Sequence, residues 1–356
     1  FLEISSLSTY VLISFGADRR ALTAAYRYLI MGTIGATFYI IGVGLMYMVT
    51  GTLNIADLAK LVPEMAHNRT IQAALAFLIV GLALKAAVFP LHMWLPNAYT
   101  YAPSAVTVFL AATATKVAVY AFIRVVFSIF GDVDILAALP VRYLLMALAL
   151  AAMFAGSLVA IYQTDVKRLL AYSSVAQIGY MILGISFDSV TGVTAGIVHL
   201  FNHALMKGGL FMAMGIVAYQ IGSVRVDDMA GLGRRMPLTM AAFVVGGLSL
   251  IGVPLTAGFI SKWYLIQATL EAGWWPIALL IVLSSLLAVI YVWRIVEVAY
   301  FRPAPDGAAD VGPEPMSMLI PTWILIGATV YFGIDATTTL DVAGAAAKAL
   351  VPGGLQ

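Results

Sequence analysis

The chain has 356 residues, of which 62% are hydrophobic and 10% are charged, and it contains no cysteine. A soluble domain carries about 25% charged residues, so this chain has too few polar side chains to cover a soluble globule or to stay disordered. Its formal net charge of +2 is too small for a protein that binds nucleic acid through basic charge. The missing cysteines exclude disulfides, thiolate zinc sites and cysteine-ligated iron–sulfur clusters. The composition predicts a polytopic all-α membrane protein.

Ten apolar stretches follow one another along the chain, and each approaches the roughly 20 residues that cross a bilayer. They are 1–16, 28–49, 71–89, 103–130, 143–162, 168–187, 191–220, 237–270, 275–298 and 317–334. The loops expected between them are 17–27, 50–70, 90–102, 131–142, 163–167, 188–190, 221–236, 271–274 and 299–316. No loop is long enough for a soluble domain, so we predict one transmembrane domain over 1–334 and a C-terminal tail, 335–356, with a short surface helix.

The beginning of the chain does not have the features of a signal peptide. Phe1 stands in place of an initiating Met, Glu3 lies in the first span, and no basic segment precedes the apolar residues. Signal peptides have a basic n-region and a small-residue cleavage site. We therefore expect the chain to be the trailing part of a longer protein.

Basic residues predict the orientation, because the cytoplasmic loops of membrane proteins are enriched in Lys and Arg. Consecutive loops alternate sides, and ten basic residues fall on one side against four on the other. The larger set is Arg19, Arg20, Arg27, Lys167, Arg168, Arg225, Arg234, Arg235, Arg294 and Arg302, and the smaller is Lys60, Arg69, Arg142 and Lys348. The larger set is predicted to be cytoplasmic, which places the tail outside.

A few ionisable residues remain inside the apolar stretches. They are Glu3, Lys85, Lys116, His199, His203, Lys207 and Lys262. A lysine at the centre of a span costs about 2.5–3.5 kcal/mol to insert, and such residues face the protein interior. Burial also disfavours the charged form of a lysine, so these groups can both lose and regain a proton. Such a set is what a proton path requires.

Three of these residues share one helix face. His199, His203 and Lys207 are spaced i, i+4 and i+8, about 6 Å apart in rise per step. A single buried histidine is more often a core residue, but this spacing suits proton carriers bridged by water. It does not suit a zinc site, because the third ligand would be a lysine and no carboxylate is near. We expect no metal and no cofactor in this chain.

Other residues allow more than one interpretation. Lys116 could instead reach the membrane surface or a backbone carbonyl. Glu3 requires a basic partner on another helix, for which Lys85 and Lys116 are the candidates, or it is a protonated acid that is hydrogen-bonded inside the bundle. His92, beside Pro90, is left open as a surface or gating residue.

Prolines interrupt two apolar stretches at membrane depth. Pro90 and Pro96 follow Lys85, and Pro254 precedes Lys262. Each break removes a backbone hydrogen bond and exposes carbonyl groups. Two interrupted segments in corresponding halves of a chain indicate internal repeats with a site near the bilayer midplane.

Together these segments resemble the antiporter-like proton-pumping subunits of Mrp-type Na+/H+ antiporters, respiratory complex I and membrane-bound hydrogenases. The segments that carry the resemblance are Leu2–Tyr10, Leu84–Pro96, Thr164–Ser174, His199–Lys207 and Pro254–Lys262. The resemblance implies two inverted five-helix repeats with broken helices, most of the first over 1–130 and the second over 143–298, followed by the last span, 317–334. It also implies that N-terminal spans are missing. In the family, a Glu pairs with the Lys of the first broken helix, and central Lys and His groups link it to a terminal group on the second.

The terminal group predicts the subfamily. One complex I subunit type has Glu where this chain has Lys262, and the largest subunits carry a lateral helix after the last span. By this comparison the chain is similar to the D-type subunit of the Mrp antiporters. The predicted function is a proton-translocating subunit of a monovalent cation (Na+)/H+ antiporter, with a path through Glu3, Lys85, Lys116, His203, Lys207 and Lys262.

The expected setting is a multi-pass position in the cell inner (plasma) membrane, beside other membrane subunits. The expected ligands are protons and Na+, and nucleic acid is not expected. The alternative function is a membrane-arm subunit of an NADH–quinone oxidoreductase or hydrogenase, with the redox centres in partner chains, because this chain has no catalytic centre of its own. A solitary solute carrier is less well supported, since the sequence shows no carboxylate-rich pocket.

Overall fold

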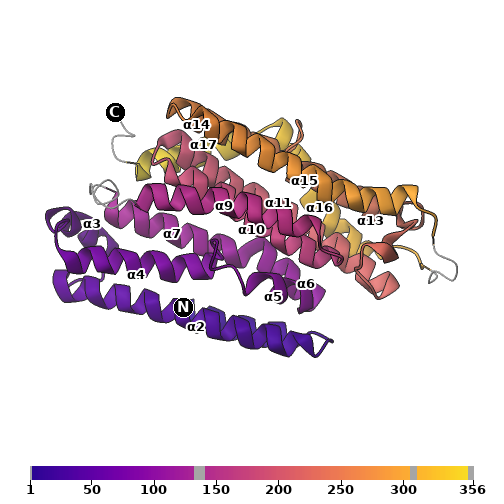
Figure 1. Ribbon diagram of the computed structural model, residues 1–356, viewed down its shortest axis with the longest axis horizontal. Coiled ribbons are helices and arrows are strands. Elements are labelled where there is room, and N and C mark those ends of the chain that lie inside the picture. Colours follow the sequence, from indigo (N-terminus) through magenta and orange to yellow (C-terminus); the bar gives the residue numbers. More distant parts are fainter. Residues whose placement is uncertain (1, 132–140, 305–310, 352–356) are drawn as a thin grey trace.

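The protein is a bundle of helices. The computed structural model describes residues 2–131, 141–304 and 311–351, and within these ranges it has no strand beyond an isolated bridge between Asp165 and Arg225. Figure 1 shows the long helices running in broadly the same direction, with α2 along one edge and α15 along the other. The predicted all-α membrane bundle is confirmed.

Each of the ten predicted spans contains a helix. In the described ranges eight helices are long and apolar enough to cross a membrane, and α1 and α13 are shorter apolar helices. The helices of the first half are α1 (Leu2–Ser14), α2 (Arg20–Thr50), α3 (Ile55–Glu64), α4 (Arg69–Ala86), α5 (Leu95–Tyr101), α6 (Ser104–Phe109), the π-helical turn η1 (Leu110–Ala114) and α7 (Thr115–Phe130). Those of the second half are α9 (Val141–Ile161), α10 (Val166–Ser186), α11 (Val190–Ile221), the 3-10 turn η2 (Asp227–Met229), α12 (Leu232–Arg235), α13 (Pro237–Ile251), α14 (Ala257–Glu271), α15 (Trp275–Phe301), α16 (Met316–Ile334) and α17 (Thr337–Leu350).

Several expected loops are partly helical, among them 90–102, which contains α5, and 221–236, which contains η2 and α12. Helix α2 begins at Arg20, so most of the expected loop 17–27 forms its first turns. The expected loop 50–70 contains α3, which Asn54 caps by accepting a hydrogen bond from Ala56 N at 2.9 Å. These helical turns are too short or too polar to stand out in a hydropathy profile, because such profiles average over about 19 residues.

Helices α2 and α4 pack closely through glycine. A Cβ atom on Gly81 of α4 would lie 2.7 Å from Gly35 O and 2.8 Å from Tyr39 N, both on α2. Only glycine allows the two backbones to approach this closely, as is typical of helix pairs in membranes. This contact positions the end of α4, where Lys85 lies.

The second half is built around α10 and α11. Nearly every residue of α10 is buried, which is unusual for a span that faces lipid, and α11 packs against α10, α13, α14 and α16. The tail carries α17, whose Ala343 and Ala347 are buried while the neighbouring Val342 is 67% exposed. Helix α17 also contacts α11. Helix α11 is therefore surrounded by other helices of the bundle.

Four of the loops predicted to be cytoplasmic, 17–27, 90–102, 163–167 and 221–236, meet at one end of the bundle. Arg20, Thr100, Asp165 and Arg225 line a single pocket there. Lys167, counted in the sequence as a loop charge, is instead buried in α10 and donates to Ser104 Oγ at 2.9 Å. The expectation that Lys167 lies in a loop was wrong. Helix α10 begins at Val166, before the apolar stretch starts, because the Asp165 side chain caps it by accepting the backbone N–H of Arg168.

Candidate functional site

Lys85 lies in the last turn of α4, just before the first break. The helix ends where Ala87 adopts a left-handed conformation with φ of 57°. The Lys85 ammonium donates to Ser6 Oγ on α1 and to the Tyr28 hydroxyl on α2, the latter at 3.3 Å. Trp94 Nε1 donates to Leu84 O at 2.9 Å. Leu84 O also accepts the backbone N–H of Ala87 at 3.2 Å, so the tryptophan adds a second donor at the end of α4, and the lysine bonds hydroxyl groups of other helices.

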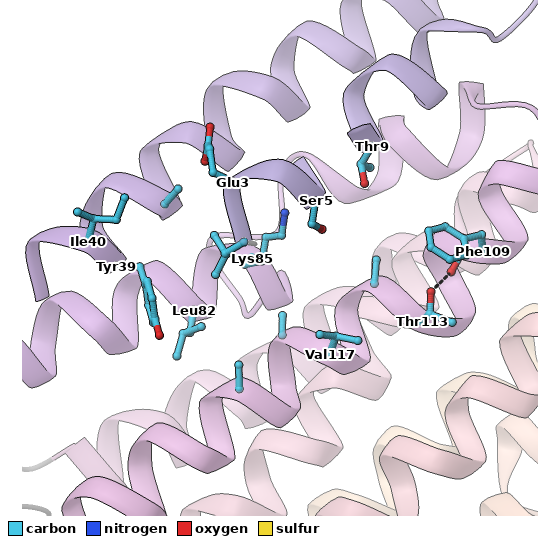
Figure 2. Close-up of a pocket in the computed structure, with 15 residues that line it drawn as sticks. Glu3, Ser5, Thr9, Tyr39, Ile40, Leu82, Lys85, Phe109, Thr113 and Val117 are labelled. Carbon is cyan, nitrogen blue, oxygen red and sulfur yellow. Dashed lines mark hydrogen bonds between the residues drawn. The ribbon is translucent and has the colours of Figure 1, made fainter. Parts of the chain in front are cut away.

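Glu3 and Lys85 line the same pocket, which has a volume of about 660 Å³. Figure 2 shows them on separate helices, with Thr9 and Tyr39 among the other lining residues. Glu3 Oε2 is buried and has no hydrogen-bond partner among the described residues. The expected Glu3–Lys85 ion pair is therefore not formed in this structure, because the lysine bonds the two hydroxyls instead.

Lys116 lies in the first turn of α7, two residues after the end of a π-helical turn. The turn η1 widens the helix at 110–114, and the Lys116 ammonium donates to Ala111 O within it. A second contact joins Lys116 Nζ to Thr115 Oγ1 at 3.4 Å, and the residue is only 6% exposed. Single π-turns occur often at functional sites. A contact with a backbone carbonyl is one of the alternatives that the sequence left open for Lys116.

The three α11 residues form a buried column. The rings of His199 and His203 are nearly parallel, with centroids 6.2 Å apart, and His199 Nδ1 lies 2.8 Å from Ser261 Oγ. Lys207 is fully buried and its ammonium donates to Leu170 O at 2.8 Å and to Ser173 Oγ at 2.5 Å, both on α10. The predicted helix face is present, and it faces α10 and α14 instead of lipid.

Lys262 lies on α14 and caps the C-terminus of α13, the helix before the second break. Its ammonium donates to Leu250 O at 3.1 Å and to Ile251 O at 2.8 Å, which are the last carbonyls of α13. A cation is favoured there because carbonyl groups at a helix C-terminus carry partial negative charge. The same ammonium lies 4.7 Å from the centroid of the Tyr180 ring. Lys262 thus satisfies the carbonyl groups that the interruption exposes.

Several buried polar atoms of α10, α11 and α15 have no hydrogen-bond partner among the described residues. They are both ring nitrogens of His203, His199 Nε2, Gln177 Oε1, Asn202 Oδ1 and the Tyr291 hydroxyl. Buried polar groups in native proteins are nearly always hydrogen-bonded, to protein or to ordered water. The cluster therefore has the donors and acceptors that a water-linked path needs.

The prolines do not all act alike. Pro90 lies in the segment between α4 and α5, and Pro254 lies between α13 and α14. Pro96 instead falls in the first turn of α5, where proline is well tolerated. Pro96 begins a helix and does not break one, which corrects that part of the expectation. His92, beside Pro90, is 8% exposed and stacks on Phe89 with ring centroids 5.2 Å apart.

Sequence reasoning missed the partners of the lysines. Ser6, Tyr28, Ser173, Tyr180 and Ser261 contact the predicted residues, and none was singled out. Hydroxyl side chains inside spans are common because they bond the carbonyl three or four residues earlier. Only the position of the other helices shows which hydroxyls meet a lysine or a histidine.

Comparison with known proteins decides the family. The family described as "NADH:quinone oxidoreductase/Mrp antiporter, TM" matches residues 1–288. The chain belongs to this family. It is a multi-pass membrane protein of the antiporter-like type, as the resemblance implied.

Two curated relatives are respiratory proteins. The chain is 46% identical to NADH-quinone oxidoreductase subunit N of Desulforudis audaxviator, covering 94% of this chain and 68% of that protein. It is 33% identical to F(420)H(2) dehydrogenase subunit N of Methanosarcina mazei, covering 98% of this chain and 72% of that protein.

Solved structures of three complexes contain a similar chain. The membrane-bound sulfane sulfur reductase, an archaeal respiratory membrane complex, matches with a TM-score of 0.90 and 33% identity over 98% of this chain and 70% of that one. The Mrp complex from Dietzia sp. DQ12-45-1b matches with a TM-score of 0.90 and 28% identity, over 99% and 74%. Respiratory complex I from Thermus thermophilus matches with a TM-score of 0.76 and 30% identity, over 96% and 73%.

These relatives change the subfamily assignment. The curated proteins named above are N subunits of dehydrogenases, whereas the Mrp complex is a neighbour in structure. They favour the membrane-arm alternative over the interpretation as a D-type Mrp protein. The presence of Lys262 does not identify the antiporter branch, because one terminal residue carries less information than identity over the whole chain.

Proposed function

We propose that this chain is a proton-translocating membrane-arm subunit of an NADH–quinone oxidoreductase. The observation that carries the proposal is the 46% identity to a subunit N protein over 94% of the chain. The buried file of ionisable residues supplies the chemistry. In this proposal the redox reaction belongs to partner chains, since this chain has no cysteine to ligate an iron–sulfur cluster.

The proposed path begins in the pocket of Glu3 and Lys85. It continues through Lys116 to the α11 column and ends at Lys262. Water bridges the gaps between the side chains, where the unpartnered nitrogens of the column offer donors and acceptors. Each lysine then acts as a relay that holds a proton between two hydrogen-bonded stretches.

The contacts of the lysines suit reversible protonation. Lys116 and Lys262 donate to backbone carbonyls, and Lys207 donates to a carbonyl and a hydroxyl. Neutral acceptors of this kind hold the amino group in place without adding a full negative charge that would keep it protonated. The charge on each lysine therefore depends on its ionisable neighbours, because charges interact strongly at low dielectric.

Coupling is proposed to lie in the first pocket. A lysine has a flexible four-carbon stem, and Glu3 offers a buried oxygen with no other partner in the described part of the chain. Swinging from Ser6 and Tyr28 to Glu3 would form an ion pair and favour the charged lysine. Breaking the pair would release the proton toward Lys116. A conformational signal from a neighbouring subunit needs only to shift α1 relative to α4.

A second candidate is the cation/proton antiporter function. The TM-score of 0.90 to the Mrp complex favours it, since the same bundle supports both types of complex. In that case the driving force would be a sodium gradient and not a redox reaction.

The test compares the two driving forces in one preparation. Inverted membrane vesicles that contain the complete complex are supplied with NADH and quinone, or with a sodium gradient, and proton uptake is followed with a pH-sensitive dye. We expect NADH-driven uptake in the wild type and background uptake in Lys85→Ala. The matched control is Lys60→Gln, which removes a charge from an exposed position on α3.

Three results would redirect the proposal. Sodium-driven uptake without an NADH-driven component would assign the chain to the antiporter branch. Full NADH-driven uptake in an assembled Lys85→Ala complex would reject the path. Equal loss in Lys60→Gln would show that the effect is not specific to the buried lysine.

A further inference from the structure

A second polar pocket lies away from the proton path, at the end of the bundle that the basic residues mark as cytoplasmic. It has a volume of about 260 Å³, and all of its lining residues are polar or charged. They are Arg20, Thr100, Tyr101, Gln163, Thr164, Asp165, Arg168 and Arg225. Three guanidinium groups and one carboxyl group thus share one small space.

The fold brings the three arginines together from distant parts of the chain. The turn before α10 pairs with the segment before η2, through Val166 N to Val224 O and Val226 N to Thr164 O, both at 2.9 Å. This pairing sets Arg225 opposite Asp165. Because the backbone of both segments is held, the positive charges are positioned by the fold and are not left to mobile loops.

Arg20 joins the cluster from the start of α2. Its guanidinium lies 4.8 Å from the centroid of the Tyr101 ring and pairs with Asp18 at 2.5 Å. Asp18 is not among the lining residues of this pocket. The partner of Arg20 therefore stands outside the pocket, and the Tyr101 ring helps to orient the guanidinium at its edge.

Arg168 supplies the observation that points to a ligand. Its Nε atom is buried and has no hydrogen-bond partner among the described residues. Buried donors of this kind are rare in native proteins, and an arginine N–H is a charged donor, which costs more to leave unpaired than a neutral one. The lone acid of the pocket, Asp165, already accepts the backbone N–H of Arg168 at 2.9 Å. Burial raises the pKa of Asp165, so it offsets the arginines less than an exposed aspartate would.

We propose that this pocket binds a phosphate group through Arg168 and Arg225, with Arg20 at its edge. Guanidinium groups match phosphate oxygens in bidentate geometry, and the hydroxyl of Thr164 adds a neutral donor, whereas the Thr100 hydroxyl already donates to Pro96 O at 2.6 Å. The pocket lies beside the first residues of α2 and α10, which are candidate membrane spans, and the ends of spans are expected near the depth of phospholipid phosphates. An anionic lipid headgroup and a free phosphate share this chemistry, and the experiment separates them.

The experiment uses the assembled complex in nanodiscs. One set contains phosphatidylcholine alone, and a second also contains phosphatidylglycerol. Native mass spectrometry counts the retained phosphatidylglycerol, and thermal unfolding of the first set is followed as inorganic phosphate is added. The variants are Arg168→Gln and Arg225→Gln. The control is Arg234→Gln, which removes the same charge from an exposed position on α12 at the same end of the bundle.

We expect retention of phosphatidylglycerol to fall about tenfold in each pocket variant, as for the loss of one charged hydrogen bond, and to be unchanged in the control. Stabilisation of the wild type by inorganic phosphate, absent in the pocket variants, would support the same site with free phosphate as its source. Equal retention in all three variants, with no effect of phosphate, would overturn the proposal. So would loss of a partner subunit from the Arg225→Gln complex, because an acidic protein segment would then fill the pocket.

Assembly is checked by the NADH–quinone reductase activity of each variant. If Arg168→Gln does not assemble, Arg225→Gln carries the test alone, since Arg225 lies in a surface segment outside the spans. Arg168→Lys adds a further distinction. It keeps the charge and loses the bidentate geometry, so an intermediate loss of lipid supports direct phosphate contact, and full retention rejects it.

Discussion

The two broken helices hold their lysines in different ways. At the first break Lys85 bonds two side-chain hydroxyls and lines an open pocket with Glu3. At the second break Lys262 is 5% exposed and bonds the last two carbonyls of α13. Hydroxyl partners on other helices can be exchanged for another partner, whereas helix-end carbonyls are fixed. In the proposed path the first site is therefore the one that can change partners, and the second keeps its amino group in one position while it gains and loses a proton.

The largest expected difference concerns arginine at the two positions. Arginine keeps its proton under all conditions that proteins meet, so Lys85→Arg should assemble in its open pocket and still lose NADH-driven proton uptake. Lys262→Arg should overpack its enclosed site, where overpacking costs about 1–3 kcal/mol, and should lower the yield of assembled complex. Proton uptake and the amount of complex on native gels measure the two effects. Normal assembly of Lys262→Arg would contradict the contrast between the sites.

The second prediction concerns Glu3, the acid of the open pocket. If the switch needs a carboxylate, Glu3→Gln should reduce proton uptake per NADH by several-fold, because a neutral amide cannot form an ion pair with Lys85. Glutamine keeps the hydrogen-bonding capacity of a protonated acid, so unchanged uptake would support the interpretation of Glu3 as a neutral, hydrogen-bonded residue. The measurement is proton uptake at a matched rate of quinone reduction.

The third prediction disturbs the helix that carries the switch. Gly81→Ala places a methyl group 2.7 Å from Gly35 O on α2 and should force α4 away from the helix that carries Tyr28. Such overpacking costs about 1–3 kcal/mol, seen as a lower thermal midpoint of the complex together with reduced uptake. Gly44→Ala on α2 is the matched control, because nothing lies within 4 Å of its new Cβ. Equal effects of the two substitutions would show that the close approach is unimportant.

The smallest expected effects come from the tyrosines beside the two lysines. Tyr28→Phe removes a hydroxyl that Lys85 bonds at 3.3 Å, which is worth about 0.5–1.5 kcal/mol and should slow uptake by a few-fold. Tyr180→Phe keeps the ring that faces Lys262 at 4.7 Å and should leave uptake nearly unchanged. Uptake rates of the purified complex in liposomes compare the two variants. A larger loss of proton uptake in Tyr180→Phe than in Tyr28→Phe would indicate that Lys262, and not Lys85, changes its hydrogen-bond partners.

The sequence by itself determined the spans and the set of buried charges. Hydropathy is a local sum, so it located a helix in each of the ten stretches. It also left Lys85, Lys116, Lys207 and Lys262 as charges that had to face the interior, and all four do so with protein partners. The prolines at 90 and 254 marked the two breaks for an equally local reason, since proline cannot donate a backbone hydrogen bond.

Only the tertiary structure decided what each charge contacts. The partners of Lys85 lie 79 and 57 residues away, and the partners of Lys207 lie 37 and 34 residues away. No local pattern carries such pairs, because they depend on how helices pack against one another. The same reason explains why Lys167 was taken for a loop charge, why Glu3 and Lys85 share a pocket without pairing, and why three arginines from distant segments meet at one end of the bundle.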